Sequence, residues 1–365
     1  MSTAPRLRVV GSGPVALAFG LFSLRQGFAP ADVELSSQSD APPAAVAGRV
    51  LALSLGSWQL LSRIATLPRA AAIETVEVSL LGHPGRTRIT ATELRVPALG
   101  YVLRYSTLMD ALQRSAQGAG LGRSMPSPPP ADTLARDPAA VVVHAEGDTG
   151  DGASVREFDQ AALLAEVSVD ARSDGTAFEC FTARGPLALL PLPEPGRHSL
   201  VWCDAPEESR RRAGLSPEQL SAELQSAFGW PLGRIALHTQ PIVWPMVRRA
   251  RRVLARGNEV WIGNAAQALH PVAGQGLNLG VRDAFLLAQV LGEAASAGRN
   301  LELALDRYLA RRRLDRGGTI ALTDTLARLF GFAPLRPLQS LALAALDATP
   351  AARAALARQF MFGVR

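Results

Sequence analysis

Residues 258–291 of this 365-residue chain read NEVWIGNAAQALHPVAGQGLNLGVRDAFLLAQVL. The apolar residues Val260–Ile262 predict a short strand, and a loop rich in alanine, glycine and proline follows them. From about Leu277 the apolar residues recur at helical spacing, which predicts a helix. The Gly274-Gln275-Gly276 turn before this helix has little bulk, so its backbone can lie close against a planar ligand. The N–H groups at the helix N-terminus would then stabilise negative charge on that ligand.

A second glycine turn lies near the N-terminus. Residues 7–10 (LRVV) predict a strand, residues 11–16 (GSGPVA) a G-x-G-x-x-A turn, residues 17–25 a helix, and residues 32–36 another strand. This succession within about 30 residues is the setting of a dinucleotide-binding unit. The basic and then apolar start of the chain is also similar to a signal peptide, but the glycines and the second strand favour a buried βαβ unit.

Three residues of this turn are expected to matter most for binding. Gly11 permits the tight turn, Gly13 lets the backbone approach a pyrophosphate, and Ala16 packs the helix on the sheet. The N-terminus of the helix then faces the phosphates with free N–H groups. The acidic residue that usually binds the ribose is missing, since Ser37 stands in its place and Glu34 lies in the opposite phase of the strand.

Residues 263–280 (GNAAQALHPVAGQGLNLG) resemble the second FAD motif of the flavoprotein aromatic hydroxylases, the family whose fold is typified by p-hydroxybenzoate hydroxylase. The residues of this motif are most similar to those of the ubiquinone-biosynthesis branch of that family. Residues 49–53 (RVLAL), 100–102 (GYV) and 244–246 (WPM) resemble further stretches of it. The resemblance implies an α/β fold with a Rossmann-like FAD-binding domain, an inserted β-sheet substrate domain and C-terminal helices.

The resemblance also suggests which residues form the site. A flavin whose N1–C2=O edge becomes anionic on reduction suits the N–H groups of the second motif, and no residue is assigned as an acid or base. The residues expected to shape the cradle over the flavin are Pro271, Gly274, Gln275 and Gly276. The residues expected to bind the cofactor are Gly11, Gly13, Ala16, Arg49, Asn264 and Asn278. Among these, the resemblance places Arg49 near the flavin and Asn264 against its ribityl chain.

Flavin-contacting segments lie in three separate regions, so the FAD-binding domain is expected to be discontinuous. It is predicted to comprise residues 1–72, 98–155 and 246–330. The substrate domain is predicted at 73–97 and 156–245, and a C-terminal helical segment at 331–365. Elsewhere, Ser127–Pro130 (SPPP) predicts a stiff connector, and Ser216–Gln219 (SPEQ) predicts a capping box that opens a packed helix.

The family's chemistry implies a flavoprotein monooxygenase. FAD would be reduced by NAD(P)H or by an electron-donor protein, O₂ would be the co-substrate, and an aromatic ring would be hydroxylated. The expected substrate is a hydrophobic aromatic small molecule, a polyprenylated ubiquinone precursor. A quinone-biosynthesis protein complex is a further expected partner.

Several departures from the family pattern gather at the adenosine end of the site. Beside Ser37, Ser106 stands where the branch usually has arginine, and Ala145-Glu146-Gly147 replaces an Ala-Asp-Gly motif. Asp40 and the Asp151-Gly152 pair are displaced substitutes for these losses. Each lost contact would weaken FAD binding by about 1–3 kcal/mol if it leaves a buried partner unpaired. The alternative function is therefore a non-catalytic or weakly flavin-binding relative that acts as a scaffold subunit in quinone biosynthesis.

The charge balance admits another class of partner. The chain has 38 basic and 32 acidic residues, a formal net charge of +6, and every basic residue is arginine. The resulting isoelectric point of about 10.4 is typical of nucleic-acid binders. The arginine clusters at 210–212, 248–252 and 311–313 have no interleaved aromatic residues and have acidic neighbours, which favours solvated helix faces and no nucleic acid.

Cysteine and histidine usage excludes two further classes of site. Two cysteines, Cys180 and Cys203, cannot form a disulfide scaffold, and the five histidines are scattered, so no metal site is expected. No uncharged apolar stretch is long enough to span a bilayer. We therefore expect a cytoplasmic protein, with residues 320–362 packed as core helices or in peripheral contact with the inner face of a membrane or with a partner.

Overall fold

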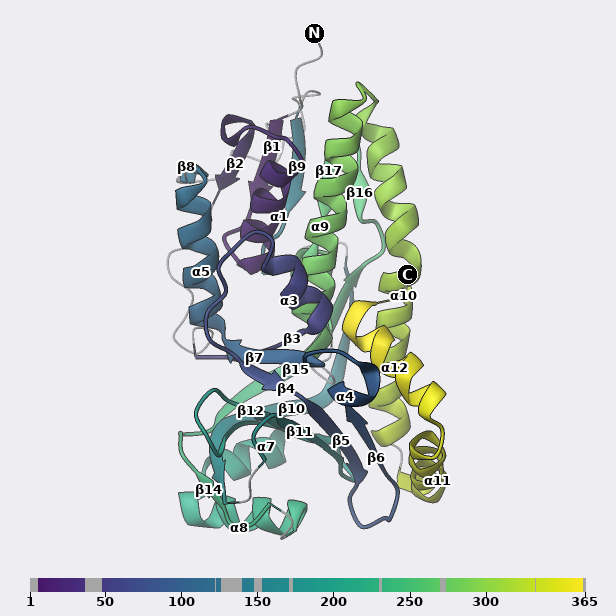
Figure 1. Ribbon diagram of the computed structural model, residues 1–365. Coiled ribbons are helices and arrows are strands. Elements are labelled where there is room, and N and C mark those ends of the chain that lie inside the picture. The colour runs from purple at the N-terminus through teal and green to yellow at the C-terminus, as the bar shows by residue number, and fades with distance from the viewer. Residues whose placement is uncertain are drawn as a thin grey trace.

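The computed structural model describes residues 6–36, 48–121, 123–125, 140–147, 153–170, 173–229, 232–269, 274–331 and 333–363. Figure 1 shows two bodies stacked end to end. One is built on a parallel sheet with long helices beside it, and the other on a larger sheet with two short helices on its outer side. This arrangement confirms the predicted α/β fold class.

The parallel sheet forms the core of the upper body. Its strand order is β16 (Ala255–Arg256), β17 (Glu259–Trp261), β9 (Ala140–His144), β1 (Arg6–Val10), β2 (Val33–Ser36) and β8 (Arg123–Met125). All neighbours are parallel except β16 and β17. The helices of this body are α1 (Pro14–Arg25), α5 (Tyr105–Gly118), α9 (Gln275–Ser296) and α10 (Leu301–Gly331). The central strand β9 is fully buried at Val141–Val143, as expected for a sheet covered on both faces.

The large sheet has nine strands within the described residues. Their order is β18 (Gln267–Ala268), β15 (Ile242–Arg251), β10 (Ala153–Val169), β13 (Arg197–Asp204), β12 (Pro186–Pro191), β11 (Thr176–Phe181), β5 (Thr75–Leu80) and β6 (Arg86–Thr90), with β14 (Ile235–Leu237) beside β10. Pairing is antiparallel except between β11 and β5. On the outer face, Leu163, Leu187 and Leu200 pack with Leu220 and Leu224 of α8 (Pro217–Phe228). The helix α7 (Pro206–Ala213) lies before α8.

A small sheet lies where the two bodies meet. Its strand order is β3 (Val50–Ser54), β7 (Gly100–Arg104) and β4 (Ala71–Ile73), all antiparallel. The helix α3 (Leu55–Leu61) continues directly from β3, and α4 (Ala91–Leu94) follows β6. Since α5 begins immediately after β7, the small sheet connects directly to the helices around the parallel sheet.

The C-terminal helices run along one edge of the molecule (Figure 1). After α10 come a short turn at Ala333–Leu335, then α11 (Arg336–Asp347) and α12 (Pro350–Phe362). On α11, the Ser340 hydroxyl accepts a hydrogen bond from the Gly85 N–H at 2.9 Å. On α12, the Met361 carbonyl lies close enough to Gly56 of α3 that a Cβ there would be 2.6 Å from it. These helices therefore bridge the large sheet and α3.

The local elements agree well with the sequence. The first strand, helix and second strand lie at Arg6–Val10, Pro14–Arg25 and Val33–Ser36, and α9 begins at Gln275, two residues before the expected start. The Ser216 hydroxyl accepts from the Gln219 N–H at 3.2 Å, which confirms the capping box. The predicted connector at 127–130 lies outside the described residues.

The domain boundaries stay a prediction. The long strand β15 runs across the expected boundary at 245/246, and β10 begins three residues before the expected boundary at 156. The large sheet therefore extends into the stretches that were assigned to the FAD-binding domain. No helix within the described ranges is both long enough and apolar enough to cross a membrane.

Candidate functional site

Three parallel strands end side by side at one edge of the upper sheet. Val10 of β1 pairs with His144 of β9, and His144 pairs with Trp261 of β17. The residues that follow these strands, Gly11 and Gly263 among them, therefore meet at the same edge. In open α/β sheets this carboxyl edge is where ligands bind.

The first glycine turn leaves a helix N-terminus open at this edge. Gly11 has φ +128°, and a Cβ on it would lie 2.5 Å from the Ala145 carbonyl oxygen, so no larger residue fits. Gly13 is the N-cap of α1, makes no side-chain cap hydrogen bond, and a Cβ on it would have no neighbour within 4 Å. Ala16 is fully buried beneath the turn. Within the described part of the chain, the turn at Gly13 thus leaves space in front of the α1 N-terminus, as a bound phosphate requires.

The turn after β17 packs against the start of α1. Gly263 has φ +59°, and a Cβ on it would lie 3.0 Å from Val15. A Cβ on Gly280 of α9 would lie 2.7 Å from the same side chain. These close approaches hold α1, α9 and the 263–265 turn in a fixed arrangement. The Asn264 side chain next to Gly263 is exposed, as a residue that contacts a ligand can be.

The N-terminus of α9 is a second open helix end. Gly274 is its N-cap, with φ +58° and no side-chain cap hydrogen bond, and a Cβ on Gly276 would have no neighbour within 4 Å among the described residues. No acidic residue occupies the first turn of the helix. Gln275 is buried, and Pro271 lies outside the described residues. The arrangement offers N–H groups to an anion, as the sequence suggests.

Asn278 anchors this turn to the small sheet. Its Oδ1 accepts from the Ser54 N–H at 2.8 Å, and its Nδ2 donates to the carbonyls of Ala52 at 3.0 Å and Gly274 at 2.9 Å. The Asn278 side chain is buried, and its amide forms these hydrogen bonds with backbone groups of the protein. A direct cofactor contact by Asn278 stays a prediction, and the observed contacts give it a positioning role.

Arg49 lies where the two bodies meet. Its guanidinium stands 4.5 Å over the ring of Trp244 on β15, and its carbonyl accepts from the Tyr105 N–H at 2.8 Å. Burial lowers the pKa of Arg49. The side chain forms no ion pair with any residue in the described part of the chain. A half-buried cation without a carboxylate partner is suited to face negative charge on a ligand.

The Ala145-Glu146-Gly147 stretch contains a histidine contact that sequence reasoning missed. His144 Nδ1 lies 3.0 Å from Glu146 Oε1, and its Nε2 lies 3.3 Å from Glu259 Oε1. The ring stacks on Trp261 at 4.8 Å. Burial lowers the pKa of His144, but hydrogen bonds with the two carboxylates outweigh it and leave the pKa above its usual value. His144 was one of five scattered histidines in the sequence. Glu146 lies two residues after it, but Glu259 is 115 positions away, so the sequence does not signal that the ring lies between two carboxylates.

The expected changes at the adenosine end of the site stay a prediction, and the structure describes only some of the residues concerned. Glu34 forms an ion pair with Arg8 on the neighbouring strand at 3.4 Å. Ser37 lies outside the described residues, and Ser106 lies in the first turn of α5. Arg104, the N-cap of α5, instead forms an ion pair with Glu166 of the large sheet.

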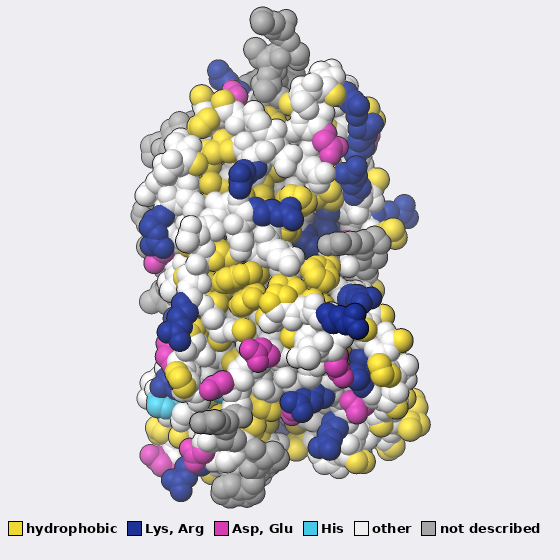
Figure 2. Space-filling view, viewed as in Figure 1, with side chains coloured by type: hydrophobic (Ala, Val, Ile, Leu, Met, Phe, Trp, Pro, Cys, Tyr) yellow, Lys and Arg dark blue, Asp and Glu magenta, His cyan; other side chains and the backbone are white. Residues whose placement is uncertain are grey.

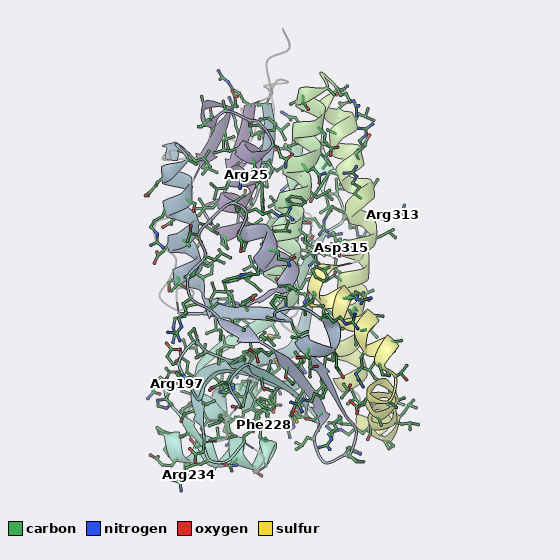
Figure 3. The ribbon with its side chains drawn as sticks, in the orientation of Figure 1. Arg25, Arg197, Phe228, Arg234, Arg313 and Asp315 are labelled. Carbon is green, nitrogen blue, oxygen red and sulfur yellow. The ribbon has the colours of Figure 1, made fainter. Side chains whose placement is uncertain are left out.

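That arginine belongs to a bridge between the two bodies. Glu166 binds both Arg104 and Arg197, the latter at 3.1 Å (Figure 3 labels Arg197). The hydrogen bond from Arg104 is the main cause that lowers the pKa of Glu166. The bridge therefore stays charged across the neutral pH range and joins β7 to the large sheet.

A buried ionic network supports the site from behind. Asp283 Oδ2 accepts from the Gly263 N–H at 3.1 Å and from Gln267 Nε2 at 2.8 Å. Its Oδ1 accepts from Arg312 Nε at 2.6 Å. Arg312 also binds Asp315 and is only 3% exposed. The assignment of all three arginines at 311–313 to a solvated face is therefore wrong for Arg312, because two carboxylates neutralise it in the interior.

The 210–212 cluster agrees with a solvated face only in part. Arg211 is exposed and binds Glu223 at 2.6 Å. The side chain of Arg212 is only 11% exposed, binds the buried Asp204 at 2.7 Å and lies over the ring of Trp202, so the solvated-face interpretation is wrong for this residue. Figure 2 shows basic side chains dispersed over the visible face with acidic side chains among them, and an apolar band across its middle. This mixture lacks the single-sign stripe that is typical of a nucleic-acid interface.

The geometry fits a flavin dinucleotide. Two uncapped helix N-termini, two glycines whose missing Cβ leaves open space, and the cation of Arg49 lie at or near one edge of the sheet. Helix N-termini bind phosphates and other anions through their free N–H groups. Among the described residues there is no group of three or more side chains that could hold a metal ion.

Comparisons with known proteins agree with this geometry. The family model of the FAD binding domain matches residues 146–318. The chain is 28% identical to the 3-demethoxyubiquinol 3-hydroxylase of Escherichia coli (strain K12), over 85% of each chain. It is 32% identical to the ubiquinone hydroxylase UbiL of Rhodospirillum rubrum, over 57% of this chain and 51% of that protein, which is about half its length. The solved structure of the flavin-dependent brominase Bmp2 superposes with a TM-score of 0.74 at 15% identity, over 99% of this chain and 94% of that one.

Proposed function

Because the chain belongs to the FAD-dependent aromatic hydroxylases, in their ubiquinone-biosynthesis branch, we propose that it hydroxylates the aromatic ring of a hydrophobic ubiquinone precursor. The observation that carries this proposal is the convergence of two open helix N-termini, at Gly13 and Gly274, on one edge of the sheet. The names of the related proteins support the ring of a quinone precursor as the substrate class.

When bound, FAD supplies the activation of O₂ for ring hydroxylation, with electrons from NAD(P)H or a donor protein. The residues of the chain bind and orient it. The N–H groups behind Gly13 would hold the pyrophosphate, and those around Gly276 would hold the anionic edge of the ring system. Arg49 adds a positive charge there, and its contact with Trp244 helps to exclude water.

The inner face of the large sheet offers a wall for the substrate. Leu164 of β10 pairs with Val201 of β13 and with Ile242 of β15, so these side chains share one face. Because Leu163 next to Leu164 packs on the outer helices, this face is the one turned toward Arg49 and Trp244. Ile242 is 44% exposed, and Leu164, Val201 and Trp244 are partly exposed. Such an apolar wall suits an aromatic ring with a prenyl tail.

Contact with a membrane and a place in a quinone-biosynthesis complex belong to the same proposal. Leu335, Leu338 and Leu341 on and beside α11 are 37%, 59% and 64% exposed. A polyprenylated substrate partitions into a bilayer. The exposed apolar face of α11, which packs near the large sheet, therefore supports peripheral contact with a membrane.

The decisive test is a titration of the purified chain with FAD, followed by flavin absorbance and fluorescence. We expect one FAD per chain and NAD(P)H oxidation that a ubiquinone precursor stimulates. Absence of binding at about 100 µM FAD would contradict the proposed monooxygenase activity, since this concentration exceeds the dissociation constant of a working FAD site. The alternative function, a non-catalytic scaffold subunit, would then be favoured.

A substitution at the first turn separates cofactor binding from folding. Gly13→Asp places a favoured N-cap residue on α1 where a Cβ meets nothing, so the melting temperature should stay unchanged or rise. The same carboxylate repels a pyrophosphate, so the dissociation constant for FAD should increase at least tenfold. Gly118→Asp, an exposed position with equally free space, is the matched control and should leave FAD binding unchanged. Equal FAD affinity in the two variants would place the phosphates elsewhere.

A further inference from the structure

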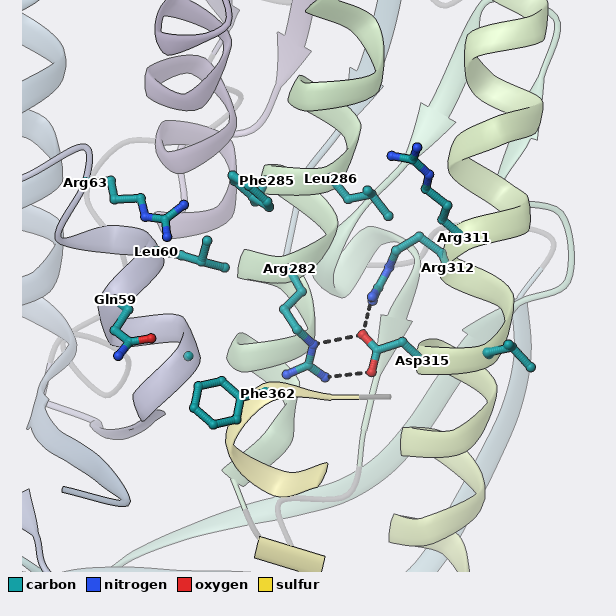
Figure 4. A pocket seen from close by; sticks show the side chains of 12 residues that line it. Gln59, Leu60, Arg63, Arg282, Phe285, Leu286, Arg311, Arg312, Asp315 and Phe362 are labelled. Carbon is teal, nitrogen blue, oxygen red and sulfur yellow. Dashed lines mark hydrogen bonds and ion pairs between the residues drawn. The ribbon is translucent and has the colours of Figure 1, made fainter. Parts of the chain in front are cut away.

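A cavity of about 390 Å³ opens between α3, α9, α10 and the end of α12 (Figure 4). Its volume falls within the range of small-molecule sites, roughly 300–1,000 Å³. Arg282, which lines it, follows Gly276 of the flavin cradle by six residues, about 9 Å along the helix axis. No residue that we assign to the flavin cradle or to cofactor binding lines the cavity, so the hydroxylation proposed above does not use it.

One side of the cavity is cationic. Arg63, Arg282, Arg311 and Arg312 line it, with Asp315 as the only acidic lining residue in the described part of the chain. Arg282 and Arg312 both bind Asp315 (Figure 4). Arg312 also binds Asp283, which does not line the cavity. Arg63 and Arg311 are exposed, and neither forms an ion pair with a described residue. The cavity thus carries positive charge that the described chain does not neutralise.

Arg282 also presents an unpaired donor. Its Nε donates to Asp315 Oδ2 at 2.8 Å, and its Nη2 lies 3.5 Å from Thr319 Oγ1. Its Nη1 is buried and has no hydrogen-bond partner among the described residues, while the side chain is only 11% exposed. A buried guanidinium N–H without an acceptor is unfavourable, so an oxygen atom is the group that this position lacks.

The other side of the cavity is apolar. Leu60, Phe285, Leu286, Leu314 and Phe362 line it, and they come from all four surrounding elements. Leu314 is 71% exposed although it is next to a buried ion pair. A ligand that satisfies both sides needs an anionic head and an apolar body of modest size.

We propose that this cavity binds a small amphipathic anion. Its carboxylate or phosphate head would accept from Arg282 Nη1 and lie between Arg63 and Arg311, since guanidinium groups match both head groups in geometry and charge. Its short alkyl or aryl body would lie on the leucine and phenylalanine side. The site requires neither FAD nor the aromatic substrate.

Calorimetric titration of the full chain with four probes tests this chemistry. Octanoate carries head and body, acetate the head alone, 1-octanol the body alone, and octylammonium the body with the opposite charge. We expect saturable one-to-one binding of octanoate, and binding at least tenfold weaker for the other three. Acetate binding as tight as that of octanoate would indicate an adventitious ion only and would overturn the proposal.

Paired variants locate the binding. Arg63→Gln with Arg311→Gln removes two exposed cations of the cavity, so the fold should be kept and the dissociation constant for octanoate should rise at least tenfold. The matched control is Arg307→Gln with Arg313→Gln, which removes the same charge from exposed positions of α10 that do not line the cavity. Figure 3 shows Arg313 on the outer side of α10, away from α9. An equal loss of octanoate affinity in the two double variants would show that net charge, and not this cavity, causes the binding, and would overturn the proposal.

Vesicles distinguish a free amphiphile from a lipid in a bilayer. Octanoate binding without cosedimentation on phosphatidylglycerol vesicles supports a pocket for soluble ligands. Cosedimentation that depends on Arg63 and Arg311, with no octanoate binding up to about 5 mM, would overturn the pocket in favour of a membrane-facing surface.

Discussion

At the scale of single residues, Glu179 is a carboxylate whose pKa is shifted by burial. It lies on β11 of the large sheet, and its Oε1 is buried with no hydrogen-bond partner in the described part of the chain. Burial raises its pKa from 4.5 to about 7. The neighbouring Cys203 thiol is buried as well, and its pKa is raised in turn. The sheet interior therefore favours the protonated form of both groups.

This shift predicts how stability depends on pH. Between pH 4.5 and about 7 the folded chain holds a proton on Glu179 that the unfolded chain has lost, so the free energy of unfolding falls as pH rises through this window. Glu179→Gln removes the ionisation. Its melting temperature relative to the parent chain should therefore increase from pH 5 to pH 7 and level off above that. Glu207→Gln, at a side chain that is 79% exposed, should follow the parent at every pH. If the melting temperatures of Glu179→Gln and the parent chain instead change with pH in the same way, the Glu179 carboxylate of the parent chain is solvated.

At the scale of elements, the pairing of α9 with α10 depends on charge as well as on apolar contacts. Asp283 of α9 and Arg312 of α10 are both nearly fully buried, and Asp283 also accepts from the Gly263 N–H in the turn beside the cradle. Breaking a buried ion pair leaves one charge without compensation, which costs more than the pair contributes. The network therefore fixes the position of the turn relative to both helices.

We predict that Asp283→Asn lowers the free energy of unfolding by about 3–5 kcal/mol, measured by urea denaturation. Its FAD affinity should also fall, because the single amide oxygen of asparagine cannot accept from both the Gly263 N–H and Arg312 Nε. The comparison is Glu207→Gln, which breaks an exposed pair with Arg210 and should cost about 1 kcal/mol or less. A cost for Asp283→Asn as small as that of the exposed pair would mean that water enters the network.

At the scale of the whole molecule, the C-terminal helices hold the large sheet to α3. The contact between α11 and the turn from β5 to β6 depends on a missing side chain, since a Cβ on Gly85 would lie 2.3 Å from the Ser340 carbonyl oxygen. Arg353 of α12 adds an ion pair with Glu93 at 2.9 Å. Close backbone packing therefore fixes the position of α11 on the large sheet, and the ion pair of α12 adds a polar contact.

Gly85→Ala should displace α11 without disturbing the parallel sheet. We expect faster amide hydrogen exchange in α11 and α12, unchanged exchange in β1 and β9, and unchanged FAD affinity. Gly118→Ala, where a Cβ meets nothing, should change none of these. Unaltered amide hydrogen exchange in α11 after Gly85→Ala would show that the turn from β5 to β6 moves while α11 stays in place.

The sequence determined the elements whose signals are local. The G-x-G-x-x-A turn fixed the order of β1 and α1, the glycines at 274–276 fixed the start of α9, and the serine at 216 fixed that of α8. Turn glycines and capping residues act through neighbours within a few positions, so they can be identified before any fold is known. The long motif at 263–280 added the resemblance to a family and, with it, the expected fold class.

Only the tertiary structure decided which polar groups meet. Asn278 binds Ser54 across 224 positions of sequence, and Gly85 meets Ser340 across 255. The burial of Arg312 and the cavity beside Arg282 likewise depend on helices that come together only in the folded chain. The sequence by itself therefore determined the two glycine turns and the helix starts that follow them, since these are local features, and the flavin cradle at 274–276 stays a prediction. The ionic support behind it and the second cavity required the fold, because charge pairing and enclosed volume depend on distances that chain order does not specify.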